Sequence, residues 1–329
     1  MGAAEGRASL RRLLVPLDGS RLAECVLPLG VSLAAHLDAR LTLLHVLERQ
    51  APSTVHGERH LTGAEEAEGY LNEVSARVLA SGVAVDRHVH PNEEDDVAKS
   101  IVDHADDLGA DLIVLCTHGG GGTLPGRRAF HRVLFGSVAQ QVLGRGLRPV
   151  LLVRPPDALA SHAAVSPELE RLLVPLDGES AAEAALPLAA TLAAAYRAEV
   201  VLRRVVPTLS TLGGERGTAA RLVPTAAAAS LDLEEGEAVR YLEDVAARPL
   251  LEGLRINASV IRGDPAQTLL DVAAQIAADM IVMVTHGRSG LDAVLTGSVA
   301  SRIAARFLKP LLLVRAPRGG SAPPAGTPS

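Results

Sequence analysis

The sequence predicts an α/β protein of two tandem doubly wound domains, each a five-stranded parallel sheet with helices on both faces. The first observation is a repeat, because the octapeptide RLLVPLDG occurs at residues 12–19 and again at 171–178. The second is the alternation of short apolar runs with helix-length segments, which is typical of a parallel sheet covered by helices. The third is length, since 329 residues suffice for two cores of ordinary size.

The repeat extends along the chain and sets the domain boundaries. Four further motifs occur in both halves, namely LPL at 27–29, THG at 117–119, GSVA at 136–139 and LLVR at 151–154. The expected organisation is a domain at 9–156, a linker at 157–169, a domain at 170–317 and a disordered tail at 318–329. The spacing between shared motifs differs between the halves, so each carries its own insertion. In the second half the weakly patterned segment is 207–230.

The composition excludes two classes of partner. A net charge of −6 and an aromatic content of 2% argue against a nucleic-acid partner, which needs a basic stripe or stacking rings. No apolar run approaches the roughly 18 residues that span a bilayer, so we expect a cytoplasmic protein without a membrane partner.

Cys25 and Cys116 lie in apolar segments and are expected to be buried thiols rather than a disulfide, a metal site or nucleophiles.

Apolar periodicity predicts the elements of each half. In the first half we expect strands at 12–17, 39–47, 83–90, 111–116 and 149–154, and helices at 20–37, 64–80, 93–108 and from Gly136. In the second half we expect strands in the RLLVPLDG copy and at 198–206, 255–262, 279–284 and 310–315, and helices at 180–196, 233–251, 264–278 and from Gly297.

Several residues suggest how these helices begin. Asp264 followed by proline is an N-cap with proline at the first helical position. Ser180 and Glu183 have the spacing of a capping box. Pro28 and Pro187 fall inside expected helices and predict a kink in each.

Two further patterns concern the first helix turn and the sheet edge. The acidic run at 93–96 is interpreted as the negative first turn of a helix, where the helix dipole favours carboxylates. The last strands, 150–153 and 311–314, are short, apolar and terminal. An uncovered edge of that kind invites pairing, so we expect these strands to pair antiparallel and to join the halves.

Two loops are suited to ligand binding. An acid, Asp18 or Asp177, follows the first strand of each half, and glycines follow the fourth strand. Open doubly wound sheets bind ligands beyond the carboxyl ends of their strands, and glycine lets a backbone approach phosphate closely. Either element alone is expected to be an ordinary turn or a loose loop. Because both occur together and twice, they indicate a nucleotide.

The chain resembles the universal stress protein family, specifically its tandem two-domain members. The resemblance rests on LLVPLDG at 13 and 172, GDPA at 263, ADLIVLCTHG and ADMIVMVTHG, the GSVA pair, and PVLLVR and PLLLVR. It implies ATP binding through the pattern G-x2-G-x9-G-[ST]. Cys116 and Val284 stand where that pattern has its first glycine.

The resemblance implies a site in each half. It places Asp18 and Asp177 at the ribose, Pro16, Leu17, Pro175 and Leu176 beside the base, and the backbone of Val46 and Val205 at the adenine edge. Phosphates would lie against Gly119, Gly126, Gly136 and Ser137 in one half, and against Gly287, Arg288, Gly290, Gly297 and Ser298 in the other. A magnesium ion would be bound through the phosphates, without a protein cage. No Walker A pattern is present, so the chain is not a P-loop NTPase.

Three functions remain open. The first is an ATP-binding stress regulator or sensor without catalytic residues. The second is an interaction or dimerisation module that has lost ATP, which Cys116 and Val284 favour. The third is a slow ATP hydrolase, for which no convincing base is present. Pairing of the halves leaves further homodimerisation and a protein partner open.

The loops between the fourth strand and the last helix carry the remaining expectations. His118 and His286 are expected to have structural hydrogen-bonding roles. The arginines at 127, 128 and 132 fit either a phosphate-binding lid or a solvated loop. The more compact spacing from Gly287 to Gly297 predicts that the second half binds nucleotide more tightly than the first.

Overall fold

In a computed structural model of the chain, residues 5–49, 53–55, 58–117, 136–155, 167–285 and 299–316 are described. The first half contributes the strands β1 (Arg12–Pro16), β2 (Arg40–Glu48), β5 (Val85–Glu94), β6 (Leu112–Cys116) and β7 (Val150–Val153). The second half contributes β8 (Arg171–Pro175), β9 (Glu199–Val206), β10 (Arg255–Arg262), β11 (Met280–Thr285) and β12 (Leu311–Arg315). A small hairpin, β3 (Thr54–Val55) with β4 (Glu58–Arg59), lies beside the first half.

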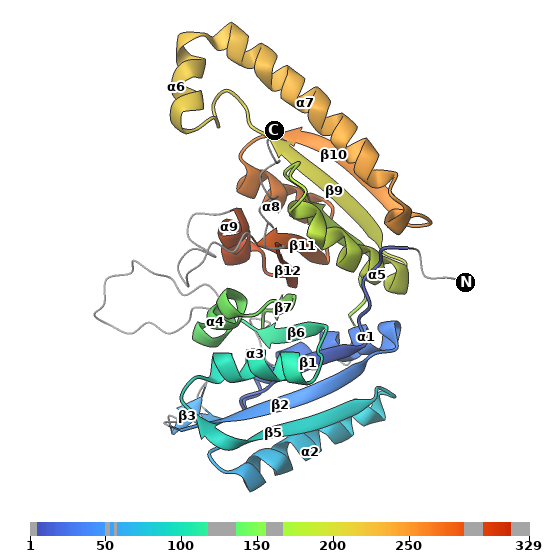
Figure 1. Cartoon of the computed structure of the whole chain (residues 1–329), viewed down its shortest axis with the longest axis vertical. Coiled ribbons are helices and arrows are strands. Elements are labelled where there is room, and N and C mark those ends of the chain that lie inside the picture. The colour runs from blue at the N-terminus through green and yellow to red at the C-terminus, as the bar shows by residue number, and fades with distance from the viewer. Residues whose placement is uncertain are drawn as a thin grey trace, which may run out of the picture.

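These ten strands form one continuous sheet in the described part of the chain (Figure 1), in the order β10-β9-β8-β11-β12-β7-β6-β1-β2-β5. Pairing is parallel within each half and antiparallel between β7 and β12, where Leu151 lies opposite Leu312. The predicted fold class and the predicted pairing through the last strands are therefore confirmed. In each half the strand order reverses beside the first strand, between β1 and β6 or between β8 and β11.

Helices cover both faces of the sheet. One face carries α1 (Leu27–Leu37), α2 (Ala64–Ala80), α5 (Leu186–Tyr196) and α7 (Pro224–Ala246). The other face carries α3 (Val97–Asp107), α4 (Ser137–Arg145), α8 (Pro265–Gln275) and α9 (Val299–Arg306). Side chains alternate between the two faces along each strand, so Leu13 and Val15 belong to the first core and Leu14 to the second. Each core includes residues of both halves, and the halves therefore bury apolar surface together.

Arg154 and Arg315, the last residues of the two LLVR motifs, form reciprocal hydrogen bonds between the halves, which we call the arginine clamp. Arg315 of β12 donates through Nη1 to the carbonyl oxygens of Gly144 and Gly146, at 3.2 and 2.7 Å, at the end of α4. Arg154, which follows β7, donates in return to the carbonyl oxygen of Ala304 in α9. A cation at a helix C-terminus satisfies carbonyls that have no partner within the helix and interacts favourably with the helix dipole. Each half thus caps the last helix of the other.

A second set of contacts between the halves lies at α1 and α5. Ser32 Oγ is 2.8 Å from the hydroxyl of Tyr196, and the imidazole of His36 stacks on the Tyr196 ring with centroids 3.9 Å apart. Thr191 Oγ1 donates to the carbonyl oxygen of Ala8 at 2.8 Å, which ties the segment before β1 to the second half.

The helix starts differ from the sequence prediction at several places. Pro28 and Pro187 lie in the first turns of α1 and α5, after the 3-10 helices η1 (Ala23–Val26) and η2 (Ala182–Ala185). The predicted kink was therefore wrong, because proline here begins an α-helix that follows a 3-10 turn and removes no interior hydrogen bond. The predicted capping box was also wrong. Glu183 forms a bidentate ion pair with Arg248 instead, at 2.8 and 2.9 Å.

The start of α8 confirms one prediction, and the start of α3 corrects another. Asp264 caps α8 by accepting from the backbone N–H of Gln267 at 2.9 Å. Asp96 caps α3 in the same way, through the N–H of Lys99 at 3.1 Å. The acidic run is thus no first helical turn, since β5 extends to Glu94 and only Asp96 belongs to the helix start.

The weakly patterned segment of the second half is helical. It contains α6 (Gly214–Leu222) and the first turns of α7. Its alanines have high helix propensity, which outweighs the missing amphipathic pattern. The predicted tail and most of the predicted linker lie outside the described residues. Among the helices that are described, none is long and apolar enough to cross a bilayer.

The reciprocal arginine clamp predicts a stability effect. Replacing Arg315 by alanine leaves two carbonyls of α4 without their charged donor, and a hydrogen bond to a charged group contributes about 1.5 to 3 kcal/mol. We expect Arg315→Ala to lower the free energy of unfolding by about that amount in urea titrations followed by circular dichroism. The control is Arg216→Ala, which removes an exposed pair with Glu234 and should cost less than about 1 kcal/mol. Equal losses in the two variants would contradict the clamp.

Candidate functional site

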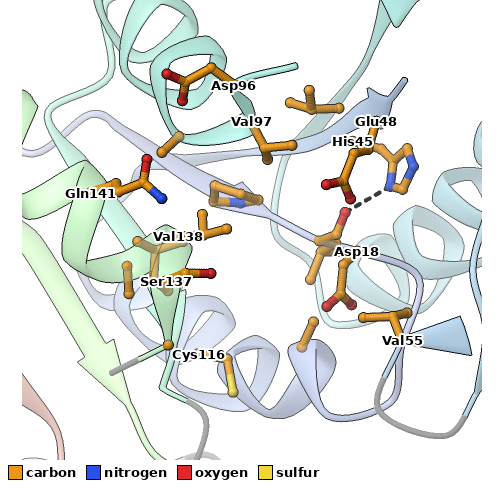
Figure 2. Close-up of a pocket in the computed structure, with 18 of the residues that line it drawn as sticks. Asp18, His45, Glu48, Val55, Asp96, Val97, Cys116, Ser137, Val138 and Gln141 are labelled. Atoms are coloured by element: carbon orange, nitrogen blue, oxygen red, sulfur yellow. Dashed lines mark hydrogen bonds between the residues drawn. The ribbon is translucent and has the colours of Figure 1, made fainter. Parts of the chain in front are cut away.

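A large cavity lies beyond the carboxyl ends of β1, β2 and β6, beside the position where the strand order of the first half reverses. It encloses about 830 Å³, and Figure 2 shows the side chains that surround it. Six residues predicted from the sequence line it together, namely Pro16, Leu17, Asp18, Val46, Gly136 and Ser137. The structure thus brings the turn after β1 and the start of α4 to one place, while the glycines predicted directly after β6 lie outside the described residues.

The turn after β1 is held by the carboxylate of Asp18. Its Oδ1 accepts from the backbone N–H of Ser20 at 2.9 Å and from the Ser20 hydroxyl at 2.7 Å. Ser20 Oγ in turn accepts from the N–H of Ala23 at 3.1 Å and so begins η1. Gly19 has φ +90°, and a Cβ there would lie 2.6 Å from a methyl carbon of Leu61. Aspartate and glycine at these positions are therefore required by the turn itself.

A buried histidine connects the ends of β1 and β2. The Nδ1 atom of His45 lies 2.8 Å from the carbonyl oxygen of Leu17, so the ring donates Nδ1–H to that oxygen. Burial lowers the pKa of His45 below its ordinary value, and the ring is neutral near pH 7. His45 thereby holds the wall of the cavity in place between Leu17 and Val46.

The N-terminus of α4 forms the opposite wall. Gly136 has φ +82° at the N-cap, and no side chain of the described residues accepts from the first N–H groups of α4. Ser137, Val138 and Gln141 of this helix line the cavity opposite Asp18 (Figure 2). The N–H groups of the first helical turn and the positive end of the helix dipole make this wall suitable for an anion.

Carboxylates line the remaining sides of the cavity. Asp96 is paired with Arg145 and Asp95 with Arg49, while Glu48 lies at the end of β2. The Arg145 hydrogen bond and the N–H of Lys99 lower the pKa of Asp96, so this carboxyl is ionised at neutral pH. The described lining therefore combines four carboxylates, two of them paired with arginine, with the N-terminus of α4.

Cys116 lines the cavity, and Cys25 lies directly beside it. Cys116 Sγ is 3.2 Å from Cys25 Sγ, and both thiols are free. The contact with Cys25 and burial raise the pKa of Cys116. Cys116 is thus buried, as predicted, whereas Cys25 is only partly buried. A protonated, buried thiol such as Cys116 is a poor nucleophile.

The second half has a smaller cavity at the equivalent place. It encloses about 270 Å³ and includes the predicted residues Pro175, Leu176, Asp177 and Val205. Asp177 accepts from the N–H of Glu179 at 2.9 Å, which repeats the turn of the first half. The buried guanidinium of Arg203 also lines this cavity and donates to the carbonyl oxygens of Leu202 and Asn257, at 2.9 and 3.0 Å.

The other predicted phosphate contacts lie outside the described residues, namely Gly119, Gly126, Gly287, Arg288, Gly290, Gly297 and Ser298. The same is true of His118, His286 and the arginines at 127, 128 and 132.

Sequence reasoning missed several lining residues of the larger cavity. His45 could have been found, because it is the one ionisable residue in the largely apolar run 41–47, next to Val46. Val55 and His60 belong to the insertion around the β3–β4 hairpin, which has no counterpart in the repeat and gave no signal. Gln141 lies one turn into α4, where only the position of the helix start could have indicated it.

Fold and site define a tandem doubly wound α/β protein with a cavity at the carboxyl end of each half-sheet. The sequence profile of the universal stress protein family matches residues 9–154 and 168–315. The chain therefore belongs to that family, as a member with two domains in tandem.

Individual relatives agree with this assignment. A universal stress protein of Mycolicibacterium smegmatis is 26% identical over 312 residues, which cover 92% of this chain and 96% of that protein. One from Methanocaldococcus jannaschii is 30% identical over 150 residues, which cover 45% of this chain and 84% of that protein. The crystal structure of a universal stress protein from Archaeoglobus fulgidus has the same fold, with a TM-score of 0.65 at 19% identity over 92% of this chain and 98% of that one.

The burial of His45 predicts a pH dependence of stability. Its folded pKa lies below the unfolded value of about 6.5, so at lower pH the unfolded chain takes up a proton that the folded ring resists. The contribution of the neutral His45 ring to the stability of the fold is fully present above the unfolded pKa and is lost as pH falls through the folded pKa. We expect the free energy of unfolding to fall less steeply between about pH 7 and 5 in His45→Gln than in the native chain, as measured by urea titration at each pH. Parallel curves for the two proteins would show that His45 does not contribute to the pH dependence of the free energy of unfolding.

Proposed function

We propose that this protein is an adenine-nucleotide-binding regulator or sensor, with ATP as its ligand and the cavity of the first half as its principal site. One observation carries the proposal. The loop that follows β1, the end of β2 and the N-terminus of α4 meet around a single cavity of about 830 Å³. Small-molecule sites occupy about 300 to 1,000 Å³, so this volume is suited to a nucleotide.

The walls of the cavity match the parts of a nucleotide. Pro16, Leu17 and Val46 supply an apolar surface for a flat base, and backbone groups at the end of β2 lie beside it. Asp18 is next to this surface and is assigned to the ribose hydroxyls. Gly136 and Ser137 lie across the cavity, where the N–H groups of α4 suit phosphate oxygens.

The acidic lining bears on the form of the ligand. Asp18, Glu48, Asp95 and Asp96 all line the cavity. Arginines pair with Asp95 and Asp96, but the carboxylates together would still repel a bare triphosphate. A magnesium ion carried by the phosphates would offset this repulsion, because Mg²⁺ favours phosphate and carboxylate oxygens and keeps several waters. We therefore propose that the ligand is Mg·ATP.

The choice of the first half departs from the sequence expectation of tighter binding in the second. The equivalent cavity there encloses about 270 Å³, below the usual range for such ligands, and Arg203 occupies part of its wall. For the second half we propose a weaker site built on Pro175, Leu176, Asp177 and Val205, or a purely structural role.

Binding without hydrolysis is the role we assign. His45 is held against the Leu17 carbonyl and Cys116 has a raised pKa, so neither provides an activated base or nucleophile. The second candidate is an interaction module without nucleotide, favoured by Cys116 at the first glycine position of the phosphate-binding pattern.

Removal of the Asp18 carboxylate distinguishes a nucleotide-binding protein from an interaction module without nucleotide. Charge-assisted hydrogen bonds to ribose contribute roughly 1.5 to 3 kcal/mol, so we expect Asp18→Ala to weaken Mg·ATP binding about 10- to 100-fold in titration calorimetry. Asp177→Ala is the matched control, because its carboxylate holds the equivalent turn of the smaller cavity. If neither variant changes the affinity, or if the native chain binds no ATP, the proposed site is wrong.

The α4 wall gives an independent test. Gly136 has φ +82°, which a β-branched residue avoids, so Gly136→Val should displace the start of the helix. We expect weaker binding of ATP and ADP but little change for adenosine, because only the phosphates contact this wall. Gly82→Val is the control, with φ +79° at a position remote from the cavity. Equal effects of both variants, or equal losses for ATP and adenosine, would contradict the assignment.

A further inference from the structure

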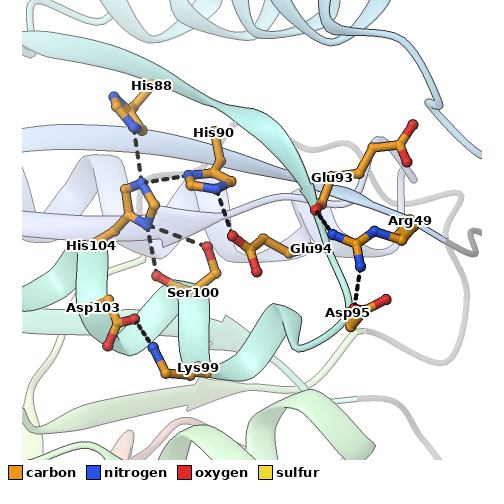
Figure 3. A network of polar contacts seen from close by, with 10 residues as sticks. All are labelled: Arg49, His88, His90, Glu93, Glu94, Asp95, Lys99, Ser100, Asp103 and His104. Carbon is orange, nitrogen blue, oxygen red and sulfur yellow. Dashed lines mark hydrogen bonds and ion pairs between the residues drawn. The ribbon is translucent and has the colours of Figure 1, made fainter.

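Three histidines form a cluster that the nucleotide cavity does not use. His88 and His90 lie two residues apart on β5, and His104 lies on α3 (Figure 3). His104 Nε2 is 3.0 Å from His88 Nε2 and 3.3 Å from His90 Nδ1. One nitrogen from each ring lies within 4.8 Å of the others, and all three residues are partly buried.

The sheet register explains why the rings converge. On β5, His88 is paired with Leu44 and His90 with Val46, whose side chains belong to the core beneath α3. Both histidines therefore point toward α3, while Val89 between them packs on the opposite face. His104 lies on the helix that covers this end of the sheet, and its ring meets theirs with centroids 4.7 and 4.9 Å away.

In His104 and His90, the ring nitrogen that faces away from the cluster (the outer nitrogen) forms a hydrogen bond that determines which nitrogen of the ring carries the proton. His104 Nδ1 is 2.7 Å from the carbonyl oxygen of Ser100, so it carries the proton and donates it. His90 Nε2 is 2.9 Å from Glu94 Oε1 and donates to that carboxylate. In the neutral rings, the inner nitrogens of His104 and His90 are then both lone-pair acceptors that face each other at 3.3 Å. Such a contact is repulsive unless a proton or a cation lies between them.

We propose that His88, His90 and His104 bind a divalent transition-metal ion of the zinc class. Zinc with Zn–N bonds of 2.0 to 2.1 Å and tetrahedral angles requires nitrogens about 3.3 Å apart, close to the two shorter separations here. Imidazole suits zinc, copper and nickel, whereas magnesium and calcium require oxygen ligands, so this site is distinct from any phosphate-bound magnesium. Three protein ligands leave a fourth position for water or another ligand.

Outer hydrogen bonds of this kind are characteristic of metal-ligating histidines. A carboxylate or carbonyl that accepts from the second ring nitrogen fixes the tautomer and makes the ligating nitrogen more basic. Glu94 does this for His90, and the Ser100 carbonyl does it for His104. The cluster therefore has both the ligands and the groups that orient them.

The second half provides an internal comparison. Its register places Ser259 opposite Arg203 and Ile261 opposite Val205, at the positions of His88 and His90. Counting from the equivalent N-caps Asp96 and Asp264, the counterpart of His104 is the buried Val272. The same strand–helix contact thus forms without a histidine, so the fold does not require the cluster.

Zinc titration of the metal-stripped full-length protein tests the proposal. We expect one zinc ion per chain to bind in titration calorimetry, cobalt(II) to give the visible bands of a tetrahedral site, and magnesium to give neither signal. His88→Ser combined with His90→Ile and His104→Val introduces residues that the second half already accommodates, and it should abolish both signals. Glu94→Gln should weaken zinc binding about 10- to 100-fold, as expected for a residue that only orients a ligand.

Two further variants make the outcome decisive. If the triple variant does not fold, His104→Val alone serves in its place and should remove the cobalt bands. His36→Gln should leave the bands unchanged, because this ring stacks on Tyr196 outside the cluster. Stoichiometric zinc binding that survives in His104→Val would overturn the proposal. The absence of saturable zinc binding in the native chain would overturn it as well. Because no nucleotide is present, these results are independent of the proposed ATP site.

Discussion

The antiparallel pairing of β7 with β12 is the interaction on which the arrangement of the two halves depends. A parallel half-sheet covered on both faces ends in an apolar strand whose backbone groups on one side require partners. Pairing Leu151 with Leu312 satisfies these groups and makes both cores continuous across the halves. The antiparallel direction also sends Arg154 and Arg315 toward the last helix of the opposite half, where each meets carbonyls that the helix leaves unpaired. One strand pairing thus determines the sheet, the cores and the helix caps.

This pairing also connects the interface to the candidate nucleotide site. The helix α4 has its N-terminus at the cavity, through Gly136 and Ser137, and its C-terminus against Arg315 of the other half. The nine residues of α4 form one short helix, so the position of its C-terminus constrains the position of its N-terminus. The wall that is suited to phosphate is therefore positioned partly by the partner half, which gives a physical reason for the halves to be joined in one chain.

The repeated motifs predicted the fold, and the short apolar terminal strands predicted the pairing of β7 with β12, because both follow from backbone requirements of a parallel sheet. The motif residues Pro16, Asp18 and Gly136 also line one cavity, as expected. Details that depend on competition between neighbours were not predictable. Glu183 pairs with Arg248, 65 residues away, and this contact replaces the local capping box. Asp96 could not be distinguished as the cap within a run of four acids until the end of β5 was known. His88 and His104 come into contact only through the register of β5 and the packing of α3, and neither can be predicted from the sequence pattern.

The two halves have the same strand order but different side chains around their cavities. Leu44 and Arg203 occupy equivalent positions, since each lies opposite the proline that ends its first strand. Leu44 is fully buried beneath α3 and leaves the larger cavity open, whereas the guanidinium of Arg203 needs carbonyl partners and lines the smaller one. The histidines of β5 likewise stand where the second half has Ser259 and Ile261. Strand interiors near β1 and β8 tolerate little change because both faces are packed, so divergence is concentrated on β2, β5 and their counterparts. β2 and β9 line the two cavities, so substitutions on these strands change the cavity lining without altering the sheet.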